Sequence, residues 1–318
     1  MNKSDSERIA ASLENDGYKP ARKINEADLV VVNMCSVRQP AVDRVFGLKQ
    51  KLYNLKSQNP NLKTILTGCL LKKDEGKFRK IFDDVRKQPW SFLYVKSKYI
   101  PISNGCDNFC TYCVVPHTRG SLACRDHKEI IREIRKSVEN GVKEIWLLGQ
   151  NVNKYKSKTT NFAKLLKMVN SLPGDFKIRF ASPNPADFSD ELIEVMAKCK
   201  KVAKFLNLPV QSGDNQILKK MNRPYTVKHY KNLVKKIRGK IPDINLSTDV
   251  IVGFPGETKK QFENTVKLFK EIKFDIAYIA KYSPRPGTAA FQLKDDIPVK
   301  EKKQRERILI ELSKQKGS

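Results

Sequence analysis

The sequence predicts an α/β protein built on parallel sheets, and two observations support this prediction. Near the N-terminus, two apolar strands that each end in a cysteine flank a helical stretch, which is the pattern of a βαβ unit. From about residue 98 onward, six apolar strand candidates alternate with amphipathic helices. Because the chain of 318 residues exceeds the size of one ordinary domain, we expect these two regions to fold as two domains.

The N-terminal region begins with a predicted helix in SDSERIAASLENDGY, where Ser4 and Glu7 form a capping box. Buried strands are predicted in ADLVVVNMC and TILTGC, with the helical stretch VDRVFGLKQKLYNLK between them. The first strand ends at Cys35 and the second at Cys69. Because ligands gather at the carboxyl ends of parallel strands, we expect both thiols to face one site. Two buried structural cysteines are the alternative.

The strand candidates of the second region are KYIPIS, EIWLLG, KIRFAS, KFLNLPV, INLSTDVIVG and DIAYIAKY. Two of the helices between them carry capping boxes, Asp126 with Glu129 and Thr258 with Gln261. A repeating strand–helix unit forms either a doubly wound sheet or a barrel, and six units are fewer than the eight of a closed barrel. The loops after the strands are rich in Gly, Pro, Ser, Asn and Gln, so we expect the functional site at these loops.

Composition and charge restrict the class of protein. Lys and Arg number 62 against 34 Asp and Glu, a formal charge of +28, which suggests a polyanionic partner bound to a basic face. A lysine-rich surface without such a partner is the alternative. The N-terminus lacks the apolar core of a signal peptide, and no apolar run approaches the roughly 18 residues of a membrane helix. We therefore expect a cytoplasmic protein without membrane contact, whose seven cysteines serve a metal or catalysis rather than disulfides.

Three of these cysteines lie in the segment GCDNFCTYC, at Cys106, Cys110 and Cys113. Iron–sulfur clusters normally take four thiolates, so three thiolates suit a cluster that leaves one iron open to another ligand. The amino and carboxylate groups of S-adenosylmethionine (SAM) can chelate such an iron, and the protein then supplies orientation and shielding. A structural zinc site completed by His117 or Cys124 is the alternative.

The flanks of this loop resemble the radical-SAM methylthiotransferase family, and GQNV favours its MiaB-type branch, which acts on tRNA. The resemblance rests on CDNFCTYCVVPHTRG, LLGQNVNKY, RFASPNP, LPVQSGDNQILKKMNR, STDVIVGFPGET and KYSPRPGTAA, and on NMCSVRQPAVDRVFG and TGC in the N-terminal region. It implies an N-terminal methylthiotransferase domain over residues 1–95 and a partial, six-unit (βα) barrel of the radical-SAM type over 96–298. A basic C-terminal helix over 299–318 would follow, without the small RNA-binding β-barrel that the family usually carries.

The resemblance also implies site residues. Cys106, Cys110 and Cys113 would hold the [4Fe–4S] cluster that cleaves SAM, and Tyr112 would pack on the adenine of SAM. Cys35 and Cys69 would belong to a second [4Fe–4S] cluster that supplies sulfur and takes three cysteines in the family. Further SAM contacts would come from the loops after the barrel strands, at Gln150, Asn151, Ser182, Gln211, Arg223, Gly253 and Pro255.

The implied reaction adds a methylthio group to C2 of N6-isopentenyladenosine beside the anticodon, at position 37 of tRNA. One SAM would methylate a sulfur at the second cluster, and another would yield the radical that takes hydrogen from C2. The implied partners are a tRNA anticodon loop and an electron donor such as a flavodoxin or ferredoxin, and we expect a monomer. Alternatives are a sibling enzyme acting on threonylcarbamoyladenosine in tRNA or on a ribosomal protein, and a non-catalytic iron–sulfur protein that binds RNA.

The sequence departs from the family pattern at its N-terminus, where the first cysteine of the second cluster is absent. Three explanations are open: a start assigned too late, a cluster on Cys35 and Cys69 supplemented by Cys124 or Cys199, or a protein without the second cluster. Without the upstream strand, the neighbouring strand presents an open edge. We therefore expect the chain as written to be less stable and less active than a version extended upstream.

Overall fold

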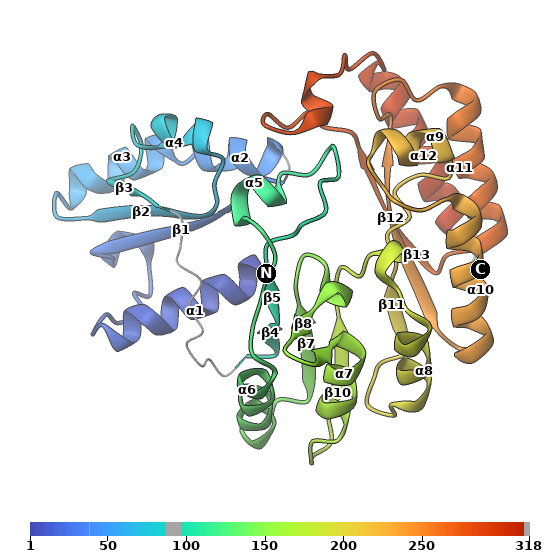
Figure 1. The fold of residues 1–318 in the computed structure, drawn as a ribbon. Coiled ribbons are helices and arrows are strands. Elements are labelled where there is room, and N and C mark those ends of the chain that lie inside the picture. The colour runs from blue at the N-terminus through green and yellow to red at the C-terminus, as the bar shows by residue number, and fades with distance from the viewer. Residues whose placement is uncertain (38, 87–96, 315–318) are drawn as a thin grey trace.

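The computed structural model describes residues 1–37, 39–86 and 97–314, which form a smaller N-terminal unit beside a larger barrel-like unit (Figure 1). The predicted domain boundary at residues 95 and 96 lies outside the described residues. No helix in the described part of the chain is both long enough and apolar enough to cross a membrane.

The N-terminal unit is built on a parallel sheet in the order β1-β2-β3. Its strands are β1 (Leu29–Cys35), β2 (Lys63–Cys69) and β3 (Asp84–Val85). Three helices cover one face of this sheet (Figure 1): α2 (Gln39–Phe46), α3 (Lys49–Gln58) and α4 (Lys72–Phe78). The predicted single helical stretch is therefore divided in two around Gly47. Buried apolar side chains such as Leu66 and Phe78 fill the space between helices and sheet.

The first helix, α1 (Asn2–Asn15), lies on the other face of the sheet and contacts the barrel unit. The predicted Ser4/Glu7 capping box is wrong, because the helix already begins at Asn2 and its N-cap is Met1. The Ser4 hydroxyl instead donates a hydrogen bond to the Tyr99 carbonyl at 3.1 Å. The Glu7 carboxylate accepts from the Ser97 hydroxyl at 2.5 Å, so both side chains attach α1 to the barrel unit and do not cap it.

The second unit contains the six predicted strands, all parallel. They are β4 (Tyr99–Pro101), β7 (Glu144–Leu148), β10 (Lys177–Phe180), β11 (Phe205–Asn207), β12 (Asn245–Val252) and β13 (Ile276–Lys281). Two sheets, β10-β7-β4 and β11-β12-β13, are joined by a parallel bridge between Ile178 and Val202. The six strands thus follow one another in chain order from β4 to β13, as expected for a partial barrel.

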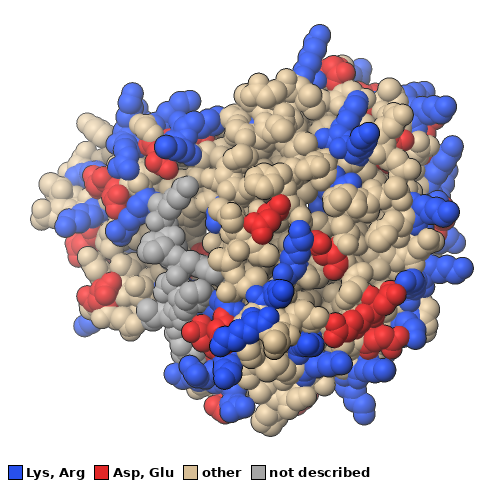
Figure 2. Space-filling model, in the orientation of Figure 1, with Lys and Arg blue, Asp and Glu red and all other residues tan. Residues whose placement is uncertain are grey.

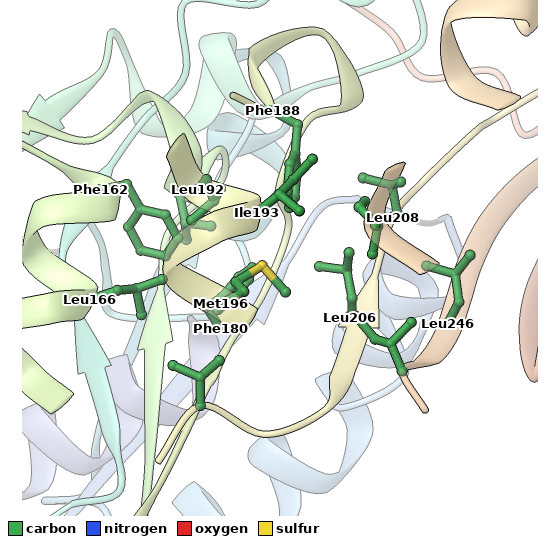
Figure 3. Close-up of a cluster of buried hydrophobic side chains, with 14 of the residues drawn as sticks. Phe162, Leu166, Phe180, Phe188, Leu192, Ile193, Met196, Leu206, Leu208 and Leu246 are labelled. Carbon is green, nitrogen blue, oxygen red and sulfur yellow. The ribbon is translucent and has the colours of Figure 1, made fainter. Parts of the chain in front are cut away.

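Helices cover the outside of these strands (Figure 1). They are α6 (His127–Glu139), α7 (Phe162–Asn170), α8 (Asp190–Lys198), α10 (Val227–Lys240), α11 (Lys259–Ile272) and α12 (Val299–Lys314). Asp126 caps α6, and the predicted Thr258/Gln261 box of α11 is formed in both directions. Figure 3 shows how α7 and α8 pack on the strands through Phe162, Leu166, Leu192, Ile193 and Met196.

The predicted basic C-terminal helix is α12, and residues 315–318 of the prediction lie outside the described residues. This helix packs on β13 and α11 instead of projecting from the molecule. Two of its cations, Lys302 and Arg305, are buried, and Arg305 forms an ion pair with buried Glu257 at 2.7 Å. Part of the positive charge of α12 is therefore neutralised inside the fold.

Candidate functional site

The three-cysteine loop begins after β4 and the short strand β5 (Ser103–Asn104) and ends at the helix α5 (Val115–Arg119). Its first residue, Gly105, has a φ of +76°, and a side chain there would place Cβ 2.1 Å from the Ser121 carbonyl oxygen. The backbone N–H of Cys106 donates to the Gly120 carbonyl at 3.1 Å. Glycine is thus required for the close approach of two backbones that fixes Cys106.

The middle of the loop is held by elements from the far side of the barrel unit. Thr111 accepts a backbone hydrogen bond from Ala290 at 2.8 Å and donates one to Met221 at 3.1 Å. Met221 follows the helix α9 (Asn215–Lys220), and Ala290 lies in the turn η4 (Ala289–Gln292) after β13. The loop is therefore hydrogen-bonded to the segments that follow β11 and β13, the fourth and sixth strands of the barrel unit.

The three thiols lie within electrostatic range of one another, and burial raises the pKa of Cys113 to about 11. Burial also raises the pKa of Cys106. Within the described residues, no three His, Cys, Asp or Glu side chains converge closely enough to hold a single metal ion. Cluster thiolates each bind a different iron, so this arrangement suits a cluster better than the zinc alternative. His117, the proposed zinc ligand, is exposed on α5.

Arg223 lies beside the loop, with Nη1 3.5 Å from the Cys110 sulfur. Its Nε donates to the Tyr225 hydroxyl at 3.0 Å, and Nη2 donates to Asn184 Oδ1 at 3.3 Å. The guanidinium is therefore held in place by two barrel loops and puts a positive charge next to a cluster thiol.

Tyr112, predicted to pack on adenine, is only partly exposed. Burial raises the pKa of its hydroxyl, so the ring remains a neutral phenol at ordinary pH. Its ring packs against a small apolar cluster made of Ile217, Met221, Phe254, Tyr282 and Ala290.

Gln150 and Asn151 follow β7. Asn151 is 2% exposed, and its amide nitrogen donates to Asp187 Oδ2 at 2.8 Å. Among the described side chains, Gln150 Oε1 and Asn151 Oδ1 are buried acceptors without a hydrogen-bond partner. Because such groups are costly to bury unpaired, these two oxygens fit a site that receives a polar ligand.

The other predicted SAM contacts lie at strand ends with unusual backbone conformations. Ser182 after β10 and Gln211 after β11 have φ values of +61° and +67°, a region that favours glycine. Gly253 after β12 has a φ of +68°, and its N–H donates to the Glu257 carboxylate at 2.7 Å. Pro255 is buried in the same turn. A positive φ is strained at Ser182 and Gln211, which are not glycines, and such strain occurs more often at ligand sites. Their contact with SAM stays a prediction.

Cys35 and Cys69 are register partners at the carboxyl ends of β1 and β2, as the βαβ pattern predicts. The Cys69 thiol is buried and accepts a hydrogen bond from Arg119 Nε at 3.0 Å. Burial raises the pKa of Cys69, and the nearby Arg119 guanidinium works against this shift. Arg119, on α5, thus connects Cys69 with Asn104, which lies just before the three-cysteine loop.

The same sheet edge carries further buried polar atoms that have no hydrogen-bond partner among the described residues. They are Asn33 Oδ1, Ser36 Oγ, Thr67 Oγ1 and, from the loop after β13, Arg285 Nε. The two thiols, the hydroxyls of Ser36 and Thr67 and the Arg285 guanidinium can donate to an anionic group at this edge, whereas Asn33 Oδ1 can only accept. The two thiols would be two of the three cysteine ligands that the family resemblance implies.

Cys124 and Cys199 do not join this edge. The Cys124 sulfur accepts a hydrogen bond from the Lys156 N–H at 3.4 Å, and Cys199 is buried at the end of α8. Both pack with the apolar core of the barrel unit, which corrects the idea that either supplements the second cluster. Sequence reasoning missed Arg119 and Arg285, although TRG and SPRPGT were among the motifs that carried the resemblance.

Comparisons with known proteins agree with this architecture. Residues 100–269 match the Radical SAM superfamily, and residues 1–87 match the Uncharacterized protein family UPF0004. Similar curated relatives are named tRNA-2-methylthio-N(6)-dimethylallyladenosine synthase. The protein from Clostridium botulinum (strain Hall) is 38% identical over 98% of this chain and 79% of its own length. The protein from Endomicrobium trichonymphae is 38% identical over 98% and 81%, and that from Clostridium novyi 40% over 98% and 78%.

Solved structures with low sequence identity share the fold. The radical SAM methyltransferase TsrM from Kitasatospora setae superposes with a TM-score of 0.58 at 13% identity, over 79% of this chain and 61% of that chain. Coproporphyrinogen III oxidase from Escherichia coli gives 0.53 at 19% identity, over 69% and 52%. This chain therefore spans about half to three fifths of the length of these structures, and the likeness concerns the fold alone.

Proposed function

This chain belongs to the radical-SAM tRNA methylthiotransferases, and we propose that it adds a methylthio group to C2 of N6-isopentenyladenosine (also called N6-dimethylallyladenosine) at position 37 of tRNA. The observation that supports this most is the neighbourhood of two cysteine sites. Arg119 contacts the Cys69 sulfur at 3.0 Å, and the next residue, Gly120, accepts the N–H of Cys106 at 3.1 Å. A sulfur source beside a SAM-cleaving site is what this reaction requires.

In the proposed site Cys106, Cys110 and Cys113 hold a [4Fe–4S] cluster, which when bound supplies the electron that cleaves SAM. The free acceptors of Gln150 and Asn151 take hydrogen bonds from the amino and hydroxyl groups of SAM. Arg223 keeps a positive charge beside Cys110 and pairs with the SAM carboxylate, a geometry that guanidinium favours. Tyr112 provides an apolar ring against the adenine.

For sulfur transfer, Cys35 and Cys69 hold the second cluster at the edge of the N-terminal sheet. These two thiols supply two of the three protein ligands that the family uses. The reaction also needs single electrons, so a flavodoxin or ferredoxin is the proposed donor, and the chain acts as a monomer.

Two surface features near the cysteines suit a tRNA anticodon loop. The helix α4, which follows Cys69, and the two residues after it expose five cations, which can contact phosphates. They are Lys72, Lys73, Lys77, Arg79 and Lys80. Phe109, within the three-cysteine loop, is 63% exposed, and an exposed ring suits stacking on a base splayed out of an RNA loop. On the face drawn in Figure 2, cations are spread around the rim instead of forming one patch.

The test uses anaerobically reconstituted protein, SAM, a reductant and tRNA that carries N6-isopentenyladenosine. We expect about eight irons per chain, 5′-deoxyadenosine, and a methylthiolated nucleoside detected by mass spectrometry. About four irons with 5′-deoxyadenosine and no methylthio product would contradict the second cluster. Cluster-bearing protein that does not cleave SAM would contradict the enzyme and leave an RNA-binding protein.

A matched substrate comparison separates the sibling reactions. The same protein is given tRNA that carries threonylcarbamoyladenosine, or the ribosomal protein substrate, in place of isopentenylated tRNA. Methylthiolation of either of these, with isopentenylated tRNA left unchanged, would replace the proposed substrate and keep the reaction class.

A further inference from the structure

Two arginines of the barrel unit reach the cysteine edge of the N-terminal unit. Arg119 ends α5, downstream of the first barrel strand, and Arg285 lies in the loop after the last barrel strand, β13. The barrel is open between its first and last strands, so the two side chains come from its two opposite edges. In Figure 1 the loop after β13 extends toward the N-terminal unit.

The contacts of Arg119 with the N-terminal unit use most of its donors. Nε donates to the Cys69 sulfur at 3.0 Å, and Nη2 donates to Asn2 Oδ1 at 3.1 Å and Asp5 Oδ2 at 2.7 Å. Nη1 donates to Asn104 Oδ1 at 3.0 Å, on β5 just before the three-cysteine loop. One planar fork thus joins the end of β2, the first turn of α1 and the approach to Cys106, a geometry that lysine cannot reproduce.

Arg285 makes the corresponding contact at the other edge. Its side chain is buried, and Nη1 donates to Gln39 Oε1 on α2. Its backbone carbonyl is held by Thr288, whose hydroxyl donates to it at 2.6 Å. The carboxylates of Asp43 and Asp74 and the thiol of Cys35 are its electrostatic neighbours. The guanidinium therefore lies between the last barrel loop and the Cys35 side of the sheet edge.

We propose that Arg119 and Arg285 form an arginine clamp that holds the Cys35/Cys69 edge at a set position over the three-cysteine loop. They are positioning residues, one for each edge of the open barrel. The clamp is distinct from the general attachment of α1, which depends on Ser4 with Tyr99 and on the buried Arg8–Glu133 ion pair. Removal of the clamp therefore loosens the cysteine edge while the two units stay together.

The purpose assigned to the clamp rests on the proposed function, but its existence is tested on apoprotein. Hydrogen–deuterium exchange is compared in wild type, Arg119→Gln and Arg285→Gln. The matched control is Arg238→Gln, because the two hydrogen bonds that Arg238 donates, to the Ile272 carbonyl at 2.6 Å and the Lys273 carbonyl at 3.1 Å, lie within the barrel unit. Peptides from β12 report whether the barrel fold is intact.

We expect Arg119→Gln to speed exchange of the hydrogen-bonded α1 amides, which begin at Asp5, and to speed alkylation of Cys69, each by about tenfold. Arg285→Gln should speed exchange in α2 and alkylation of Cys35. Arg238→Gln should change neither the exchange of α1 and α2 nor the alkylation of Cys35 and Cys69. Equal exchange in both clamp variants and in the control would overturn the proposal. If an arginine variant does not fold, Asp5→Asn and Gln39→Ala remove the partner from the N-terminal side instead.

A second readout separates positioning from general stability. In reconstituted enzyme, Arg119→Gln should keep SAM cleavage within about twofold while the ratio of methylthio product to 5′-deoxyadenosine falls about tenfold. Arg119→Lys, which keeps the charge, should recover part of that ratio. Parallel loss of both products would overturn the positioning role. Wild type that never forms methylthio product would overturn the proposed function instead, while the exchange result still decides the clamp.

Discussion

The two cysteine sites of this molecule are built in different ways. Cys106, Cys110 and Cys113 share one loop, and hydrogen bonds from distant barrel loops only hold that loop in place. Cys35 and Cys69 lie far apart in the chain and meet because two parallel strands are in register. The first site is thus a property of a short segment, whereas the second exists only when the N-terminal sheet is folded.

The two sites nevertheless share one structural feature, which is a glycine with positive φ directly before a cysteine. Gly105 has a φ of +76° and Gly68 a φ of +104°. A Cβ on Gly68 would lie 2.4 Å from the Met34 carbonyl oxygen, much as one on Gly105 would meet the backbone at Ser121. In both places a close approach of backbones sets the direction in which the following thiol points.

The largest expected effect separates the sites by their chemistry. Cys110→Ala should lower SAM cleavage by on the order of a thousandfold or more, because the loop loses a cluster ligand. The measurement is 5′-deoxyadenosine formed by reconstituted protein. Substantial SAM cleavage by this variant would show that the loop is not the cluster site.

Cys69→Ala should have the complementary effect. The variant is expected to keep SAM cleavage within about twofold and to lose methylthio product, together with about four irons. Iron analysis and nucleoside mass spectrometry measure the two results. A variant that keeps the methylthio product would remove Cys69 from the sulfur-transfer site.

The difference between the sites also explains what could be predicted from sequence. The spacing of three cysteines between 106 and 113 is a local signal, and the six alternating strands gave the barrel-like unit its order. The pairing of Cys35 with Cys69 followed from one general rule about parallel sheets. The Ser4/Glu7 box failed because Ser4 donates to the Tyr99 carbonyl and Glu7 accepts from the Ser97 hydroxyl. Arg119 was missed because its partners are all distant in the chain.

The barrel site is expected to depend on the buried ion pair between Glu257 and Arg305. Glu257 accepts the N–H of Gly253 and pairs with Arg305 at 2.7 Å. Glu257→Ala should lower the free energy of unfolding by about 2–4 kcal/mol, because it removes the carboxyl group that accepts from the buried Arg305 guanidinium and from the Gly253 N–H. Chemical denaturation of apoprotein measures this. The exposed pair Lys204–Asp243 provides a control, where Asp243→Asn should change the free energy of unfolding far less because solvent screens the pair.

The stability of the Glu257 variant relative to wild type is also expected to depend on pH. Burial raises the pKa of Glu257 above 4.5, although the Gly253 N–H and Arg305 oppose the shift. The folded state therefore holds this proton more tightly than the unfolded state, so the contribution of Glu257 to stability is lost as pH rises from 4.5 through the raised pKa. The stability difference between wild type and Glu257→Ala should shrink over that range. A difference that grows with pH would mean that the ion pair outweighs burial.

The smallest effects test the shared glycine feature. Gly105→Ala and Gly68→Ala should each cost about 2–3 kcal/mol, because the new Cβ overlaps backbone and the residue must keep a positive φ. Their consequences should differ as the sites differ: Gly105→Ala loses iron from the SAM-cleaving site, while Gly68→Ala keeps SAM cleavage and loses methylthio product. Gly76→Ala in α4 is the matched control, since nothing lies within 4 Å of its added Cβ, and it should stabilise by about 0.5–1 kcal/mol. If both glycine variants impaired SAM cleavage equally, the two sites would not be independent of each other. A distortion at Gly68 would then reach the three-cysteine loop through the arginine clamp.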